Sequence, residues 1–136
     1  YGGEMSAHHY FRDFSYCDSG MIPWLLLAEN IAESGKSLAD LMDERIEAYP
    51  CSGEINFQVG DTGQVIDQVL QRYVDQNPEI DRTDGISLEF ECWRFNLRAS
   101  NTEPVIRLNV ETRKDADLLA QKTAELSGFI QSFGQD

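Results

Sequence analysis

A polar segment at residues 98–104 lies between two apolar, strand-like runs and carries residue types that can hold a phosphate group. Within five positions it places an arginine, two hydroxyl side chains and an amide: Arg98, Ser100, Asn101 and Thr102. A guanidinium matches two phosphate oxygens with its planar N–H pair, hydroxyls donate to a third, and turn backbone N–H groups can form an anion nest. The pattern indicates a phosphate-binding hairpin. The alternative is an ordinary polar turn with a solvated arginine, because Ser, Asn and Thr are common turn residues.

A second polar motif lies at residues 1–13, which read YGGEMSAHHYFRD, and three of its side chains alternate: Glu4, Ser6 and His8. In an extended loop, residues two apart project to the same side, so we expect a carboxylate, a hydroxyl and an imidazole along one edge. Such a set suits a ligand rich in hydroxyl groups, for example a sugar. Three alternatives remain open: surface histidines, a Glu4 that caps the next helix, and a Glu/His metal pair without a third ligand.

The chain is strongly acidic, because its 136 residues include 24 acidic and only 11 basic ones, for a formal net charge of −13. This charge argues against nucleic acids and anionic membrane surfaces as partners. A small phosphorylated ligand stays possible, because Arg94, Arg98 and Arg107 all lie around the predicted hairpin. A local cluster of arginines outweighs the global field at short range.

The cysteines Cys17, Cys51 and Cys92 are widely spaced and match no metal-binding pattern. We expect reduced, buried or half-buried thiols in a cytoplasmic protein. The longest apolar stretch, residues 21–28, is too short to span a bilayer. The chain begins at Tyr1 and opens directly into a motif, which predicts that further residues precede it in a longer protein.

Apolar periodicity predicts two regions with a boundary at residues 49–50. Before it, helices at 22–33 and 38–48 carry apolar residues at helical spacing, and we expect them to bury a broad face. Asp18 either caps the first of these helices or holds a residue of the preceding motif.

Beyond the boundary, alternation predicts strands, and helical spacing predicts helices, in the order β-α-β-β-β-α. The predicted strands cover residues 54–59, 86–91, 93–97 and 105–111; the helices cover 64–76 and the stretch from Lys114 or Asp115 onward; residues 78–83 are predicted to be a loop. Strands joined by short turns form an antiparallel meander. The predicted fold class is therefore α+β, with helices on one face of an antiparallel sheet.

The two polar motifs together resemble the α-D-phosphohexomutases, and most closely the bacterial phosphomannomutases of that superfamily. GGEMSAHHYFRD is similar to the family's sugar-specificity loop, and RASNTEPVIRLNVE is similar to the phosphate-binding loop of its C-terminal domain. DRTDGIS and WRFNL also fit that domain. The resemblance implies that residues 1–49 form the end of the third of four domains, with two helices, and that residues 50–136 form the whole fourth domain.

The resemblance also implies roles for individual residues. Glu4, Ser6 and His8 would contact hexose hydroxyls, while a second set would hold the phosphate that is not being transferred: Arg98, Ser100, Asn101 and Thr102. The loop often has glycine where this chain has Ala7, which restricts the backbone slightly. No stretch matches the family's catalytic serine or its metal-binding Asp triad, so we expect no catalytic residue and no metal ligand in this chain.

For the full-length enzyme the resemblance implies reversible interconversion of mannose 6-phosphate and mannose 1-phosphate. It implies Mg²⁺ and a hexose 1,6-bisphosphate activator, neither of them bound by this segment. The expected partners are the phosphorylated hexose and the N-terminal domains of the same chain. By itself the segment is expected to be inactive. The alternative function is a non-catalytic anion-binding or protein-interaction module of the same fold.

Overall fold

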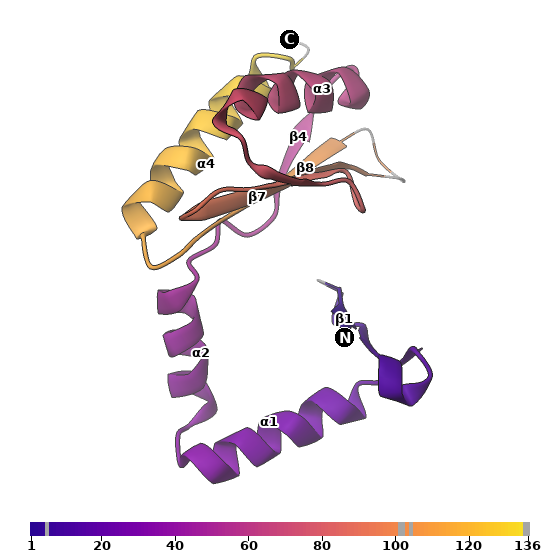
Figure 1. The fold of residues 1–136 in the computed structure, drawn as a ribbon, viewed down its shortest axis with the longest axis vertical. Helices are drawn as coiled ribbons and strands as arrows, with labels where there is room; N and C mark the ends of the chain where they lie inside the picture. The colour runs from indigo at the N-terminus through magenta and orange to yellow at the C-terminus, as the bar shows by residue number, and fades with distance from the viewer. Residues whose placement is uncertain (5, 101–102, 104, 135–136) are drawn as a thin grey trace. The chain divides into compact units, whose positions relative to one another are not determined.

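The computed structural model describes residues 1–4, 6–100, 103 and 105–134, which fall into two compact units, Tyr1–Asp43 and Glu44–Asp136 (Figure 1). The division lies inside one helix, and each unit is described here by itself.

The second unit is built on a five-stranded antiparallel sheet with the strand order β4-β8-β7-β6-β5. The strands are β4 (Ile55–Gln58), β5 (Glu79–Asp81), β6 (Ile86–Glu89), β7 (Trp93–Ala99) and β8 (Val105–Thr112). Strands β5 to β8 form a meander, and β4 pairs with the outer side of β8. The helix after β4 therefore carries the chain across the sheet, from one edge to the other.

Two helices, α3 (Thr62–Tyr73) and α4 (Ala116–Gln131), lie on the same face of this sheet (Figure 1). Each begins at an aspartate whose side chain accepts a backbone N–H of the first turn: Asp61 from Gln64 at 3.0 Å, and Asp115 from Leu118 at 2.8 Å. A short 3₁₀ turn, η2 (Val74–Gln76), continues α3. The predicted α+β class, with helices on one face, is thus confirmed.

The core lies between the helices and the sheet, because alternate strand residues point toward the helices. The buried strand residues include Trp93, Phe95, Leu97, Ile106, Leu108 and Val110, and the buried helix residues include Val69, Tyr73, Leu126 and Ile130. The residues between them on β7 and β8 form a polar face on the other side: Arg94, Asn96, Arg98, Arg107, Asn109 and Glu111. The core thus fixes which way these polar side chains point.

The first unit opens with a small antiparallel sheet of three short strands, β1 (Gly2–Gly3), β2 (His9–Phe11) and β3 (Cys17–Asp18). A 3₁₀ turn, η1 (Arg12–Phe14), follows β2. Helix α1 (Met21–Ser34) then ends at Gly35, which adopts a left-handed φ of 67°. Helix α2 (Leu38–Ala48) contains the division between the units, and none of the described helices is long and apolar enough to cross a membrane.

Two expectations about the elements are wrong. Residues 78–83 are not only a loop, because they contain β5, a three-residue edge strand whose residues are all exposed. An exposed edge strand needs no buried alternation, so it gives no apolar pattern to detect. The second unit therefore has four consecutive strands after α3 instead of three.

The expected buried face of the two N-terminal helices is also absent, because neither α1 nor α2 contains a buried residue. Trp24 is 60% exposed and Leu25 is 55% exposed. Apolar spacing shows which face of a helix favours burial, but it does not show that the covering surface lies in the same chain.

The cysteines differ from the expectation as well. Cys17, Cys51 and Cys92 are free, but all three are exposed. Cys17 lies in the two-residue β3, Cys92 in the turn between β6 and β7, and Cys51 in the segment that leads into β4. These positions lie outside the core, so the thiols contact solvent.

Candidate functional site

The β7–β8 hairpin places two arginines directly opposite each other at its loop end. Arg98 and Arg107 are register partners across the two strands. Both lie on the polar face, because their neighbours Leu97 and Leu108 are buried in the core. Like charges in directly opposed positions repel, so this arrangement needs a compensating anion.

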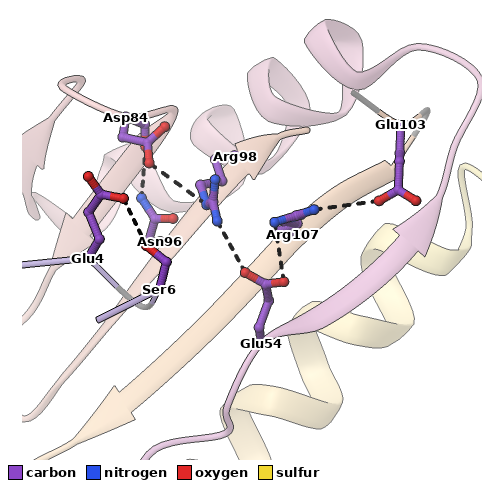
Figure 2. Close-up of polar contacts among 8 residues, drawn as sticks. All are labelled: Glu4, Ser6, Glu54, Asp84, Asn96, Arg98, Glu103 and Arg107. Atoms are coloured by element: carbon purple, nitrogen blue, oxygen red, sulfur yellow. Dashed lines mark hydrogen bonds and ion pairs between the residues drawn. The ribbon is translucent and has the colours of Figure 1, made fainter. Parts of the chain in front are cut away.

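Glu54 supplies that anion. It immediately precedes β4, whose Asn56 is the register partner of Arg107. Its Oε2 accepts a hydrogen bond from Arg98 Nη2 at 3.1 Å, and its Oε1 lies 3.5 Å from Arg107 Nη1 (Figure 2). One carboxylate thus bridges two guanidinium groups, with one oxygen on each.

Two further carboxylates flank the pair at greater distance or exposure. Asp84 Oδ2 lies 3.8 Å from Arg98 Nε, and Glu103 Oε2 lies 3.5 Å from Arg107 Nη2. Their side chains are 71% and 64% exposed, whereas those of Arg98, Arg107 and Glu54 are 30%, 25% and 28% exposed. The central bridge is therefore better shielded from water than the flanking contacts, and less weakened by it.

The turn between β6 and its neighbour holds Arg98 from below. Gly85 has a φ of 71°, and a Cβ there would stand 2.7 Å from the Cα of Arg98. Asn96 fastens the same turn, because its Nδ2 donates to the carbonyl of Asp84 at 2.9 Å and to the hydroxyl of Ser87 at 3.0 Å. Only glycine allows this close approach, which fixes the backbone from which Arg98 projects.

Of the four residues predicted to hold a phosphate, the structure describes two. Arg98 lies near the end of β7, and Ser100 begins the loop, where its backbone N–H donates to the carbonyl of Val105 at 2.9 Å. The Ser100 hydroxyl accepts the backbone N–H of Glu103 at 3.3 Å. Asn101 and Thr102 lie outside the described residues, and their predicted roles stay predictions.

Sequence reasoning did not assign Glu54 or Arg107 to this site. Arg107 carried a usable signal, because the alternation of β8 places it on the polar face. Glu54 carried none, because it precedes Arg98 by 44 positions and meets it only through the pairing of β4 with β8.

The motif in the first unit is a tight reversal between β1 and β2, not an extended edge. The backbone N–H of Glu4 donates to the carbonyl of His8, and that of Ala7 donates to the carbonyl of Glu4, each at 3.0 Å. Ala7 closes the turn with a left-handed φ of 65°, a conformation that glycine adopts more easily. The prediction that Glu4, Ser6 and His8 share one edge is therefore wrong, because the chain turns back between them.

The reversal separates the three side chains into two groups. Glu4 accepts hydrogen bonds from the hydroxyls of Ser6 at 2.9 Å and Tyr10 at 2.8 Å. His8 Nδ1 lies 2.7 Å from Asp18 Oδ2, and Asp18 Oδ1 accepts the backbone N–H of His9 at 2.8 Å. Of the two roles considered for Asp18, the structure shows the one that holds the preceding motif.

These contacts shift the pKa values of both groups. The hydrogen bond from Tyr10, followed by that from Ser6, lowers the pKa of Glu4, and the same contact raises the pKa of Tyr10. The hydrogen bond with Asp18, and then its charge, raise the pKa of His8, while His8 lowers the pKa of Asp18. Glu4 is thus an ionised carboxylate that accepts hydrogen bonds from hydroxyl groups, as a sugar site requires.

The described part of the chain does not fit a metal ion. Within residues 1–4, 6–100, 103 and 105–134, no three His, Cys, Asp or Glu side chains gather as a set of ligands. Glu4 and His8, the pair considered as a metal site, instead bind hydroxyls and Asp18 respectively.

Comparison with known proteins gives a consistent picture over both units. The family model described as "Phosphoglucomutase/phosphomannomutase, alpha/beta/alpha domain III" matches residues 1–49. The model described as "Phosphoglucomutase/phosphomannomutase, C-terminal domain" matches residues 54–127.

Several curated relatives are similar over nearly the whole chain. It is 62% identical over 131 residues to "Phosphohexose mutases" of Xanthomonas campestris pv. campestris (strain B100). It is 54% identical over 132 residues to a phosphomannomutase of Salmonella montevideo, and 56% identical over 126 residues to one of Escherichia coli (strain K12). These alignments cover 93–97% of this chain, which spans only 28–29% of the relatives' length.

A solved structure has a similar fold. A phosphoglucomutase/phosphomannomutase family protein from Burkholderia thailandensis matches with a TM-score of 0.67 and 22% identity. The match covers 96% of this chain and 27% of that protein.

Proposed function

The chain belongs to the phosphoglucomutase/phosphomannomutase family, and from this premise we propose that it binds the substrate of a phosphomannomutase. In this proposal the loop end of the β7–β8 hairpin holds the phosphate that is not being transferred. Arg98, Ser100, Asn101 and Thr102 act there, while Glu4, Ser6 and His8 contact the sugar. The domains divide at residues 49–50.

The observation that carries the proposal is the position of Arg98. It is a half-buried cation on the polar face of the sheet, next to a loop that carries hydroxyls and an amide, in a chain of net charge −13. A guanidinium concentrated at such a place in an acidic protein favours a small anion over a polyanionic surface. The ionised Glu4, which already accepts two hydroxyl groups, supports the sugar part.

The reaction of the whole protein interconverts mannose 6-phosphate and mannose 1-phosphate. A phosphoserine outside this chain gives its phosphoryl group to the free hydroxyl of the sugar phosphate, and after the bisphosphate turns over, the other phosphoryl group returns to serine. Mg²⁺ and a hexose 1,6-bisphosphate activator belong to this proposal, but no described side chains here fit the metal. What this chain supplies is binding and orientation, which account for much of phosphoryl-transfer catalysis.

Turnover of the bisphosphate explains the composition of the site. The phosphate site has to accept a phosphate on C1 in one half of the reaction and on C6 in the other. Hydroxyls around one arginine tolerate both approaches, because a hydroxyl rotates and both donates and accepts. By itself the chain is proposed to be inactive, since the nucleophile lies elsewhere.

The test is an amide NMR titration of this chain with mannose 6-phosphate at low salt. We expect weak, saturable shifts at residues 98–102 and in the adjoining strand ends, lost in the R98A variant. Equal shifts in wild type and R98A would contradict the proposed phosphate site. No shift at high millimolar ligand would instead favour a protein-interaction module, whose acidic surface has no affinity for sugar phosphates.

A further inference from the structure

We propose that Arg107 is a second guanidinium ligand for the same phosphate group, and that Glu54 is a resident anion which the phosphate displaces. The inference rests on the proposed function and adds to it two residues outside the 98–102 segment. It changes the site from one arginine with hydroxyls into a pair of arginines with an internal competitor.

The first observation is the contrast between the two ends of the same hairpin. At the far end Arg94 is the register partner of Glu111, and their charged atoms lie 3.5 Å apart. At the loop end Arg98 is the register partner of Arg107. Opposite charges across a strand pair stabilise a sheet, and like charges destabilise it. The arginine pair is thus unfavourable for the hairpin alone and points to an anion as its purpose.

The second observation is the geometry of the bridge. The two oxygens of Glu54 lie 3.1 Å from Arg98 Nη2 and 3.5 Å from Arg107 Nη1, so the carboxylate occupies the space where the guanidinium groups converge (Figure 2). Charged hydrogen-bond donors that close on one acceptor form the binding geometry typical of phosphate and carboxylate alike. Glu54 is therefore a chemical stand-in for a phosphate.

The third observation is a donor that Glu54 leaves unused. Arg107 Nε is buried and has no hydrogen-bond partner among the described residues. A buried N–H without an acceptor is unfavourable, and a bound anion with more oxygens can satisfy it. A carboxylate has two oxygens, whereas a phosphate monoester has three terminal oxygens and more negative charge.

These observations define an exchange. In the ligand-free protein, Glu54 neutralises the two arginines and holds them in position. A phosphate monoester offers a larger charge and a third acceptor, so it takes over the guanidinium groups, and Glu54 turns toward solvent. The carboxylate weakens phosphate binding but keeps the site ordered, which suits a site that must release and rebind its ligand in one catalytic cycle.

The competing explanation is that Glu54 only cross-links β4 to the hairpin. The two explanations predict opposite signs for Glu54→Gln. If Glu54 competes with phosphate, the neutral side chain raises phosphate affinity. If it only orients the arginines, loss of its charge loosens them and lowers affinity.

The experiment measures dissociation constants for inorganic phosphate and for mannose 6-phosphate by NMR titration of the whole 136-residue chain. Four variants are compared with wild type: E54Q, R107Q, R98A and the control R94Q. We expect E54Q to bind about three- to tenfold more tightly and R107Q about tenfold more weakly, the scale of one charged hydrogen bond. R94Q should stay within about twofold, because Arg94 pairs with Glu111 at the other end of the hairpin.

The outcomes separate this inference from the proposed function. If R98A weakens binding while R107Q and E54Q match wild type, the single-arginine site stands and this inference fails. If E54Q binds more weakly than wild type, although its amide spectrum and urea unfolding remain native, Glu54 is only a cross-link and the inference fails. If neither wild type nor E54Q binds either probe, both proposals fail.

Discussion

His8 Nδ1 lies 2.7 Å from Asp18 Oδ2, and this pair fastens the turn after β1 to strand β3. The same carboxylate accepts the backbone N–H of His9 through its other oxygen, at 2.8 Å. One aspartate thus sets the shape of a loop that lies ten residues before it.

The first prediction is that His8 titrates above its ordinary pKa of 6.5, because Asp18 stabilises the protonated ring. A raised histidine pKa gives stability that is present below the unfolded pKa and is lost as pH rises through the folded one. The lowered pKa of Asp18 gives stability that is lost as pH falls through its folded value, below 3.8. The hairpin is therefore most stable between about pH 4 and 6.5.

NMR titration of the His8 ring protons measures this pKa directly. In the D18N variant the carboxylate is gone but the shape is similar, so the pKa of His8 should fall back toward 6.5. A wild-type value at or below that of D18N would contradict the pairing.

The second prediction concerns Arg98 in a full-length phosphomannomutase that carries this segment. Arg98→Ala should raise KM about 10- to 150-fold, since a hydrogen bond between charged groups contributes about 1.5–3 kcal/mol. The effect on kcat should be smaller, because the phosphate held here is not the one transferred. Steady-state kinetics with mannose 6-phosphate test this, with R94A as the matched control on the same strand. An unchanged KM would make Arg98 an ordinary hairpin residue.

The third prediction uses two glycines that share a left-handed backbone but differ in surroundings. Gly85 has φ 71° and packs against the backbone of Leu97 and Arg98, whereas Gly53 has φ 68° and open space at its Cβ position. Gly85→Ala should destabilise the second unit by about 2–5 kcal/mol, from backbone strain plus the clash. Gly53→Ala should cost only about 1–2 kcal/mol, from strain alone.

Urea unfolding of both variants, followed by far-UV circular dichroism, gives these free energies. The two substitutions add the same methyl group at nearly the same φ, so the difference between them isolates the contact with Arg98. Equal free energies for both variants would show that Gly85 does not fix the position of that strand end.

The sequence predicted the second unit well where burial imposed a pattern. On β8, Ile106 and Leu108 are buried while Arg107 between them is not, so alternation identified both the strand and its polar face. Strand β5 has no buried residue and gave no such signal. The pattern therefore detects strands that cover the core and overlooks strands that only extend its edge.

The site was predicted less completely, for two different reasons. The link from Glu54 to Arg98 depends on the pairing of distant strands, which no local spacing contains. The separation of His8 from Glu4 depends on the left-handed backbone at Ala7, which an L-residue other than glycine rarely adopts. Residue types indicated the chemistry of both motifs, but the backbone decided which side chains meet.

The last prediction concerns Tyr73, which is fully buried and donates its hydroxyl to Glu125 at 2.8 Å. Its ring packs against Phe90, Trp93 and Phe95, with ring centroids 5.5–6.0 Å away. Burial, followed by the hydrogen bond to Glu125, raises the pKa of Tyr73 far above 10, so the phenol stays a donor at every pH at which the protein folds.

Ring and hydroxyl contribute separately, and two substitutions distinguish them. Tyr73→Phe should cost only about 1 kcal/mol, the net value of a typical hydrogen bond, because Glu125 keeps Lys122 at 2.9 Å as a partner. Tyr73→Ala should cost about 3–5 kcal/mol, because it leaves a cavity among the aromatic rings. If urea unfolding gave Tyr73→Phe most of the alanine loss, the hydroxyl contact, and not the packing of the ring, would hold α3 to α4 and the sheet.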